Sequence, residues 1–405
     1  MKKIATLVGS AALLAASLVP AIAATYNCTN GTTGPFSNNT CSITNTDHIS
    51  VNNVNDAYIK NDVDAKSDTG HNSASTNTLG GSIKTGNATA NVTVSNVANI
   101  NTTNITSDLA GGAHNVGANS ITGPLSDNNA FITNSFDAYL WNSNTAKVKN
   151  DVDVKSETGH NDANTNTGPA VINTGDAWLG LLVATHVNDN LNQISGGAGG
   201  SGSNTAENST TGPFSNNTVS LTNRRSATVN NVNDLYVKND VDAKADSGHN
   251  DANKNTLGGL INTGGAAAGV GVNTEGNINS TLVAMGGFTD NFGANSVTGP
   301  GGGGKDPNEV FITNSRDVVV DNWNNKCLSH NADDQFGHTV YWEGEWKRDG
   351  CDVRDLGVRN DVDVKTETGK NDANTNTGGG DIMSGFADLW QQVLTHMNDT
   401  LTQIY

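Results

Sequence analysis

Paired aspartates are the residues of this sequence whose type and spacing could do chemistry. The quartet Asn-Asp-Val-Asp begins at residues 61, 150, 239 and 360. Carboxylate oxygens are the ligands that Ca²⁺ prefers, so each pair is a candidate calcium ligand. The candidates are Asp62, Asp64, Asp151, Asp153, Asp240, Asp242, Asp361 and Asp363. Two carboxylates two residues apart on one strand lie about 7 Å apart, and neighbouring lysines compete for them. A solvated charged face is therefore the preferred interpretation, and calcium binding is the alternative.

Histidine follows three of the four quartets and suggests no catalysis. His71, His160 and His249 occupy equivalent places, but the fourth copy has Lys370. An active site is normally built once, and a catalytic histidine would not be replaced by lysine in one copy. The sequence contains no GxSxG, P-loop or HExxH motif. We expect a protein that is not an enzyme and has no catalytic residues, and whose only candidate cofactor is the Ca²⁺ of the aspartate hypothesis.

These motifs belong to a four-fold repeat. Thr-Gly-Pro begins at residues 33, 122, 211 and 298, so its spacings are 89, 89 and 87 residues. The quartet spacings are 89, 89 and 121, which places an insertion at 321–357 in the fourth unit. Units one and three resemble each other, as do two and four. The predicted parts are a signal peptide 1–24, units 25–121, 122–194, 205–297 and 298–405, and a Gly/Ser linker 195–204.

Period-two alternation predicts strands in each unit. From Ile49 to Thr69, one set of alternate residues is uncharged and its complement carries the charges, which is typical of a strand with one face in water. Asn, Thr and small residues at inward positions suit stacked rungs, where identical polar side chains form ladders. We predict an all-β, elongated, β-solenoid-like architecture of four units. Tandem small β-sandwich domains are the alternative, since 89 residues is close to a sandwich domain's length.

The ends of units two and four are unusually apolar. The stretches 175–194 and 385–405 fit either a strand or a helical stripe, and correspondence with 86–101 favours the strand. An exposed strand at a chain end could complete another subunit's sheet, although it could equally cap its own unit. The assembly candidates are Leu389, Trp390, Val393, Met397, Leu401 and Ile404.

The insertion at 321–357 is the most aromatic part of the chain. We interpret it either as a recognition surface or as a stapled hairpin with its own small core. The recognition candidates are Trp323, Tyr341, Trp342 and Trp346. The four cysteines most simply pair locally, as Cys28 with Cys41 and Cys327 with Cys351. Such disulfides suit an exported protein.

Composition and the first residues indicate export. Two lysines, an apolar run and Ala21-Ile22-Ala23 are typical of a signal peptide. The formal charge of −18 disfavours binding to nucleic acid. We expect a secreted, extracellular or cell-surface protein that does not insert into the membrane after signal cleavage.

The signal peptide, the four TGP…NDVD…TG(H/K)N units and the Asn/Thr alternation resemble the Asn/Thr/Gly-rich repetitive secreted proteins of bacterial surfaces: adhesins, fibre subunits and β-solenoid exoproteins. The resemblance implies a non-enzymatic structural or adhesive protein that associates with itself, with other surface proteins or with glycans. A Ca²⁺- or glycan-binding module is the alternative. An ice- or mineral-surface binder is a further one.

Overall fold

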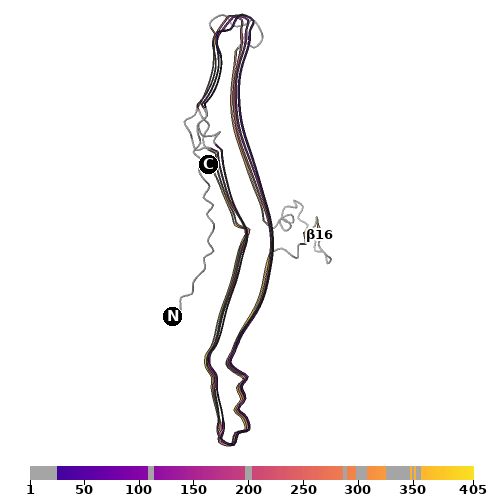
Figure 1. Ribbon diagram of the computed structural model, residues 1–405. Helices are drawn as coiled ribbons and strands as arrows, with labels where there is room; N and C mark the ends of the chain where they lie inside the picture. Colours follow the sequence, from indigo (N-terminus) through magenta and orange to yellow (C-terminus); the bar gives the residue numbers. More distant parts are fainter. Residues whose placement is uncertain are drawn as a thin grey trace, which may run out of the picture.

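A computed structural model describes residues 25–107, 114–196, 203–285, 290–297, 308–324, 347–348, 351–352 and 357–405. All regular elements in these ranges are strands, which confirms the predicted all-β, elongated, solenoid-like architecture. No membrane-spanning helix occurs in the same ranges. In Figure 1 the molecule is long and narrow, and the traces of its four repeats run together along almost the same path.

One repeat makes one rung, which is a single closed turn of the chain. Rung 1 contains β1 (Thr25–Asn30), β2 (Asn38–Asp68), β3 (Gly81–Lys84) and β4 (Ala88–Ser107). The 31 residues of β2 extend for about 100 Å at the usual rise of a strand. The chain turns at β3 and returns along β4 and the first strand of the next rung (Figure 1).

Rungs 2 and 3 repeat this path. Rung 2 contains β5 (His114–Thr122), β6 (Asp127–Glu157), β7 (Ala170–Asn173) and β8 (Ala177–Gly196). Rung 3 contains β9 (Ser203–Thr211), β10 (Asn216–Asp246), β11 (Gly259–Asn262), β12 (Ala266–Gly276) and β13 (Asn279–Met285).

Rung 4 follows the same path with one interruption. It contains β14 (Asp290–Val297), β15 (Asn308–Asn324), β18 (Gly357–Glu367), β19 (Gly380–Met383), β20 (Ala387–Met397) and β21 (Thr400–Ile404). Both β15 and β18 pair with β10, so the insertion leaves the rung between Asn324 and Gly357. Within the insertion, β16 (Lys347–Arg348) pairs with β17 (Cys351–Asp352).

Equivalent residues of successive rungs pair in register, except for one shift between Asn295 and Val297 where β14 pairs with β9. Every pairing between rungs is parallel, with β6 on β2 and on β10 over their full length. A register position therefore forms a column, meaning one residue from each rung, stacked along the direction of the hydrogen bonds. The tandem-sandwich alternative does not occur, because no unit closes a core without its neighbours.

The predicted inward and outward faces are confirmed by burial. Along β6 and β10, nearly every second side chain is buried. The long sheet of β2, β6, β10, β15 and β18 packs against the sheet of β4, β8, β12 and β20, and aliphatic columns fill the space between them. The column of Val94, Val183 and Val272 is one example. The interior is thin. Along a column, a buried side chain is shielded from water only by the equivalent side chains of the neighbouring rungs.

Left-handed residues form the corners of each rung. His71, His160, His249 and Lys370 share one register position and have φ between 58° and 61°. Asn99, Asn188, Asn277 and Asn398 form another such column with φ between 56° and 65°. Asparagine and histidine tolerate this region better than β-branched residues. The corner after the NDVD strand therefore has the same backbone in every rung.

The structure also places the predicted disulfide, the apolar stretches and the starts of the rungs. Cys28 and Cys41 form the predicted disulfide. The apolar stretches 175–194 and 385–405 are strands rather than helices. Residues 114–121 and 290–297 belong to the first strands of rungs 2 and 4, so these rungs begin earlier in the chain than the predicted units 122–194 and 298–405. The side chains of Cys327 and Cys351, and linker residues 197–202, lie outside the described residues.

Candidate functional site: the histidine column and the end rungs

The candidate calcium ligands lie on the outer face of the long sheet. Each aspartate of the NDVD quartet stacks on its equivalent in the next rung. The Asp62 side chain is 74% exposed. Lysines on the same strands pair with these carboxylates, as Lys155 Nζ does with Asp153 Oδ2 at 2.9 Å and Lys238 Nζ with Asp240 Oδ2 at 2.9 Å. The Ca²⁺ hypothesis stays a prediction. The structure shows that lysines on the same strands contact these carboxylates and would compete with an ion for them.

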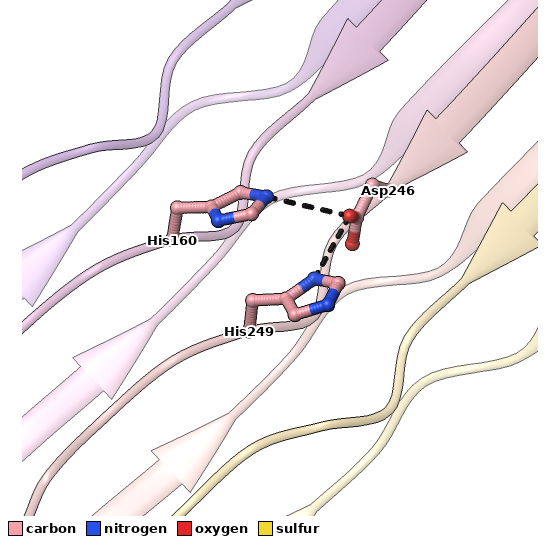
Figure 2. Close-up of side chains that lie close together, drawn as sticks. All are labelled: His160, Asp246 and His249. Atoms are coloured by element: carbon pink, nitrogen blue, oxygen red, sulfur yellow. Dashed lines mark hydrogen bonds and ion pairs between the residues drawn. The ribbon is translucent and has the colours of Figure 1, made fainter.

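Two groups of three metal-ligand residues occur in the described part of the chain, and neither includes these aspartates. Both lie at the corner after the NDVD strand. One contains His160, Asp246 and His249, and the other contains Asp68, His71 and Glu157. In Figure 2, His160 from rung 2 and His249 from rung 3 both point at the Asp246 carboxylate. His160 Nε2 lies 3.5 Å and His249 Nδ1 lies 3.0 Å from Asp246 Oδ2.

The Asp246 carboxylate is the centre of this cluster. Its side chain is fully buried, and burial opposes its charge. Hydrogen bonds from Lys244 Nζ (2.9 Å) and from the Gly248 backbone N–H (2.8 Å) outweigh burial, so the pKa of Asp246 is lowered. Burial also lowers the pKa of His160, and the neighbouring histidines lower it further. The cluster therefore holds a charged carboxylate beside a neutral His160 at neutral pH.

The ring geometry argues against a single metal ion at this cluster. The His71, His160 and His249 rings stack with centroids 4.8 and 4.6 Å apart and planes within 10° of parallel. A metal ion lies in the plane of each imidazole that binds it, and one ion cannot lie in two parallel, separated planes. Lys244 also already occupies the carboxylate. The arrangement is a column of stacked rings beside a column of carboxylates.

Basic side chains in this region bridge one rung to the next. Lys66 Nζ lies 3.0 Å from Glu157 of rung 2. His160 contacts Asp246 of rung 3, and Lys244 Nζ lies 3.5 Å from Glu367 of rung 4. In these three contacts the lower rung supplies the base and the higher rung supplies the acid, while Lys244 Nζ also lies 3.9 Å from Glu157 of the rung below.

The buried asparagine columns have the same polarity. Asn55 donates its Nδ2 to Asn144 Oδ1, Asn144 donates to Asn233, and Asn233 donates to Asn324, at 2.8–2.9 Å. Parallel ladders follow the columns that begin at Asn39, Asn45, Asn53 and Asn61. Every ladder runs from rung 1 to rung 4. Rung 1 therefore ends each ladder with a carbonyl oxygen, and rung 4 ends it with an NH₂ group.

The predicted assembly residues lie on the uncovered end of the stack. Val393 of rung 4 is 41% exposed, whereas Val183 and Val272 in the same column are at most 1% exposed. Leu389 and Ile404 also face inward, and both are about half exposed because no rung covers them. Trp390 and Leu401 point outward and are exposed, and Met397 is partly buried. The apolar interior is thus open at rung 4.

The aromatic recognition candidates are placed only in part. Trp323 lies near the end of β15 and its side chain is 38% exposed. Tyr341, Trp342 and Trp346 lie outside the described residues. The recognition hypothesis therefore remains a prediction.

Glycine columns are a feature that the sequence reasoning missed. A Cβ on Gly70 would lie 1.9 Å from the carbonyl oxygen of Gly159, and one on Gly159 would lie 1.7 Å from that of Gly248. A Cβ on Gly248 would lie 2.1 Å from Gly369, but one on Gly369 would meet nothing within 4 Å. The signal was available in the sequence, because this glycine stands at the same place in all four repeats.

Comparisons of the chain with protein-family models, with curated proteins and with solved structures found no match.

Proposed function

We propose that this chain is a secreted, non-enzymatic structural or adhesive protein of the cell surface or extracellular matrix, and that it self-associates through its β-strands. The uncovered rung 4 is the observation that carries the proposal. Within the described part of the chain it presents unpaired strand edges and half-exposed aliphatic side chains, among them Val393 and Ile404. Open, flat strand edges pair readily with another chain, and burial of apolar surface stabilises association.

Electron microscopy of the mature chain, residues 25–405, tests this proposal. We expect filaments from the intact chain. Deletion of 386–405 removes β20 and β21 and with them most of the apolar half of the end rung, so filaments should be lost. Monodisperse short particles from both proteins would overturn the proposal.

Calcium binding is a second candidate function, supported by the stacked, exposed carboxylates of the NDVD columns. The same carboxylates pair with lysines, which reduces their negative potential. A rise in thermal stability on adding Ca²⁺, lost when Asp62, Asp151, Asp240 and Asp361 are all replaced by asparagine, would support this function. An unchanged melting curve would exclude it.

A further inference from the structure

The two ends of the stack are complementary, and this points to one defined mode of assembly. Rung 1 resembles rung 3 in sequence, and rung 4 resembles rung 2. The junction between rung 2 and rung 3 is therefore a natural template for rung 4 of one copy meeting rung 1 of another. The ladders agree with this template, since rung 4 offers amide NH₂ groups where rung 1 offers amide oxygens.

The first charge match lies in an inward-facing column. Asp47, Phe136, Arg225 and Arg316 share one register position. Burial and repulsion from Arg316 lower the pKa of Arg225, so the two arginines are adjacent like charges at the rung 4 end. A second copy stacked on rung 4 would bring its Asp47 onto Arg316.

Two further charge matches lie on the outer face. His48 Nδ1 and Asp137 Oδ2 of rungs 1 and 2 are 3.0 Å apart, and Asp317 occupies the same register position in rung 4. Stacking would place Asp317 on the open side of His48. At the corner, Lys370 follows the histidine column, and it would lie beside Asp68 of the next copy. That contact repeats the one between His160 and Asp246.

The glycine columns supply a steric match. One column directs its Cβ positions toward the higher rung and ends open at Gly369. A second column runs the other way, because a Cβ on Gly385 or Gly264 would lie 2.3 Å from the carbonyl oxygen of the rung below, and it ends open at Gly86. Each column thus ends in a glycine, Gly369 or Gly86, at a place where the chain's own structure has room for a side chain.

We propose that copies of this chain stack head to tail, with rung 4 of one copy in register on rung 1 of the next, to form a polar fibre with continuous asparagine, histidine/lysine and glycine columns. The inference rests on the proposed self-association and adds its partner, direction and register. The rings of Phe386 and Trp390 do not obstruct this end, because they lean toward rung 3 over Gly265 and Gly269.

Alanine at the open glycines tests the stacking. Gly369→Ala and Gly86→Ala add a methyl group to opposite ends, where neither meets an atom of its own chain within 4 Å. In the fibre, each methyl would lie about as close to a carbonyl of the neighbouring copy as the 1.7–2.4 Å found within the chain. We expect folded monomers whose critical concentration for assembly is raised at least tenfold.

Gly31→Ala is the matched control. Gly31 also lies on rung 1 with no atom within 4 Å of its Cβ position. The pairs Asn30–Asn119 and Thr33–Thr122 on either side make Ser120 and Ser209 its equivalents in rungs 2 and 3, so the column accepts side chains between those rungs. We expect this variant to assemble like the wild type.

Reversing the charge at Asp47 or at Arg316 tests whether copies stack head to tail. Asp47→Arg or Arg316→Asp alone should suppress assembly, because each puts like charges at the junction. A mixture of the two variants should assemble, because it offers complementary ends at every junction. Asp127→Arg, an exposed change of the same charge within rung 2, should have no such effect. Circular dichroism checks that each variant is folded.

The outcomes separate this inference from the proposed function. Wild-type filaments that also form from Gly369→Ala and Gly86→Ala would overturn head-to-tail stacking and leave self-association intact. A wild type that never assembles would overturn both. Assembly only after residues 325–356 are replaced by Asp-Leu, as at 234–235 of rung 3, would show that the insertion caps the end and would overturn stacking of the intact chain.

Discussion

Replacing a central ladder asparagine should cost more than replacing a terminal one. Asn144 is 1% exposed and makes four side-chain hydrogen bonds of 2.8–2.9 Å. It accepts from Asn55 and Asn101, and it donates to Asn190 and Asn233. Each partner keeps another bond within the network, so Asn144→Ala removes four bonds without fully isolating a partner. At about 1 kcal/mol net for each bond, the expected loss is about 4 kcal/mol.

The loss of stability for Asn144→Ala is compared with that for Asn324→Ala, the terminal member of the same column. Asn324 of rung 4 accepts from Asn233 and Asn279, at 2.9 and 3.0 Å. Asn324→Ala should therefore cost about half as much, about 2 kcal/mol. Asn52→Ala, on the exposed face of rung 1, should cost less than about 0.5 kcal/mol.

Urea unfolding of the monomeric variants, followed by circular dichroism, measures these differences in the free energy of unfolding. The expected order is Asn144, then Asn324, then Asn52. Equal losses for Asn144→Ala and Asn324→Ala would refute the ladder reasoning. A loss below about 1 kcal/mol for Asn144→Ala would refute it too, since replacing an exposed or singly bonded asparagine costs no more than that.

Three further predictions follow from the same contacts. Gly159→Ala should destabilise the monomer by at least about 3 kcal/mol or prevent folding, because its Cβ would overlap the Gly248 carbonyl; a melting temperature equal to that of the wild type would contradict this. The hydrogen bonds that His186 donates to Asp189 and then to Glu275 raise the pKa of His186 to about 9; because this folded-state pKa exceeds the unfolded value of 6.5, the stabilisation is complete below pH 6.5 and is lost as the pH rises through about 9. Since His186 is partly exposed, we expect the loss to be about 1 kcal/mol, seen in urea unfolding across this pH range and absent in His186→Gln; a wild-type stability that stays flat would count against the ion pairs. Millimolar Ca²⁺ should stabilise the chain by less than about 0.5 kcal/mol in thermal melts, because lysines already pair with the NDVD carboxylates, and a larger rise would favour the calcium site.

The sequence was sufficient to predict the faces of the strands. Strict alternation from Ile49 onward separated inward asparagine and valine from outward aspartate and lysine, and the buried pattern of β6 agrees. The local disulfide between Cys28 and Cys41 was predictable because both cysteines lie close together in one repeat. The repeat also gave the correct number of units, since the structure has one rung per unit.

The partner of each strand was not predictable from alternation. Period two says which face is buried, but it does not say whether 89 residues fold into a small sandwich or into one rung. A strand of 31 residues is several times longer than an ordinary strand, so a shorter, folded-back unit was a reasonable expectation. The rung is favoured by asparagines that recur at the same inward positions of each repeat, because each then bonds its equivalent in the next rung.

The contacts of the corner cluster were also not predictable from a local sequence pattern. The sequence argued against a catalytic role for His71, His160 and His249, and their left-handed backbone makes them corner residues. Their stacking, and the buried Asp246 that His160 and His249 share, depend on the in-register approach of residues 86–89 positions apart. No local pattern in one repeat contains that information.

X-ray diffraction from aligned assemblies of the mature chain tests the central claim most directly. Head-to-tail stacking places the inter-strand spacing along the fibre axis, so we expect a meridional reflection at about 4.8 Å and a repeat of about 19 Å for the four rungs of one copy. Fibres in which the 4.8 Å reflection lies on the equator would mean that copies join tip to tip or side to side, and would contradict the account.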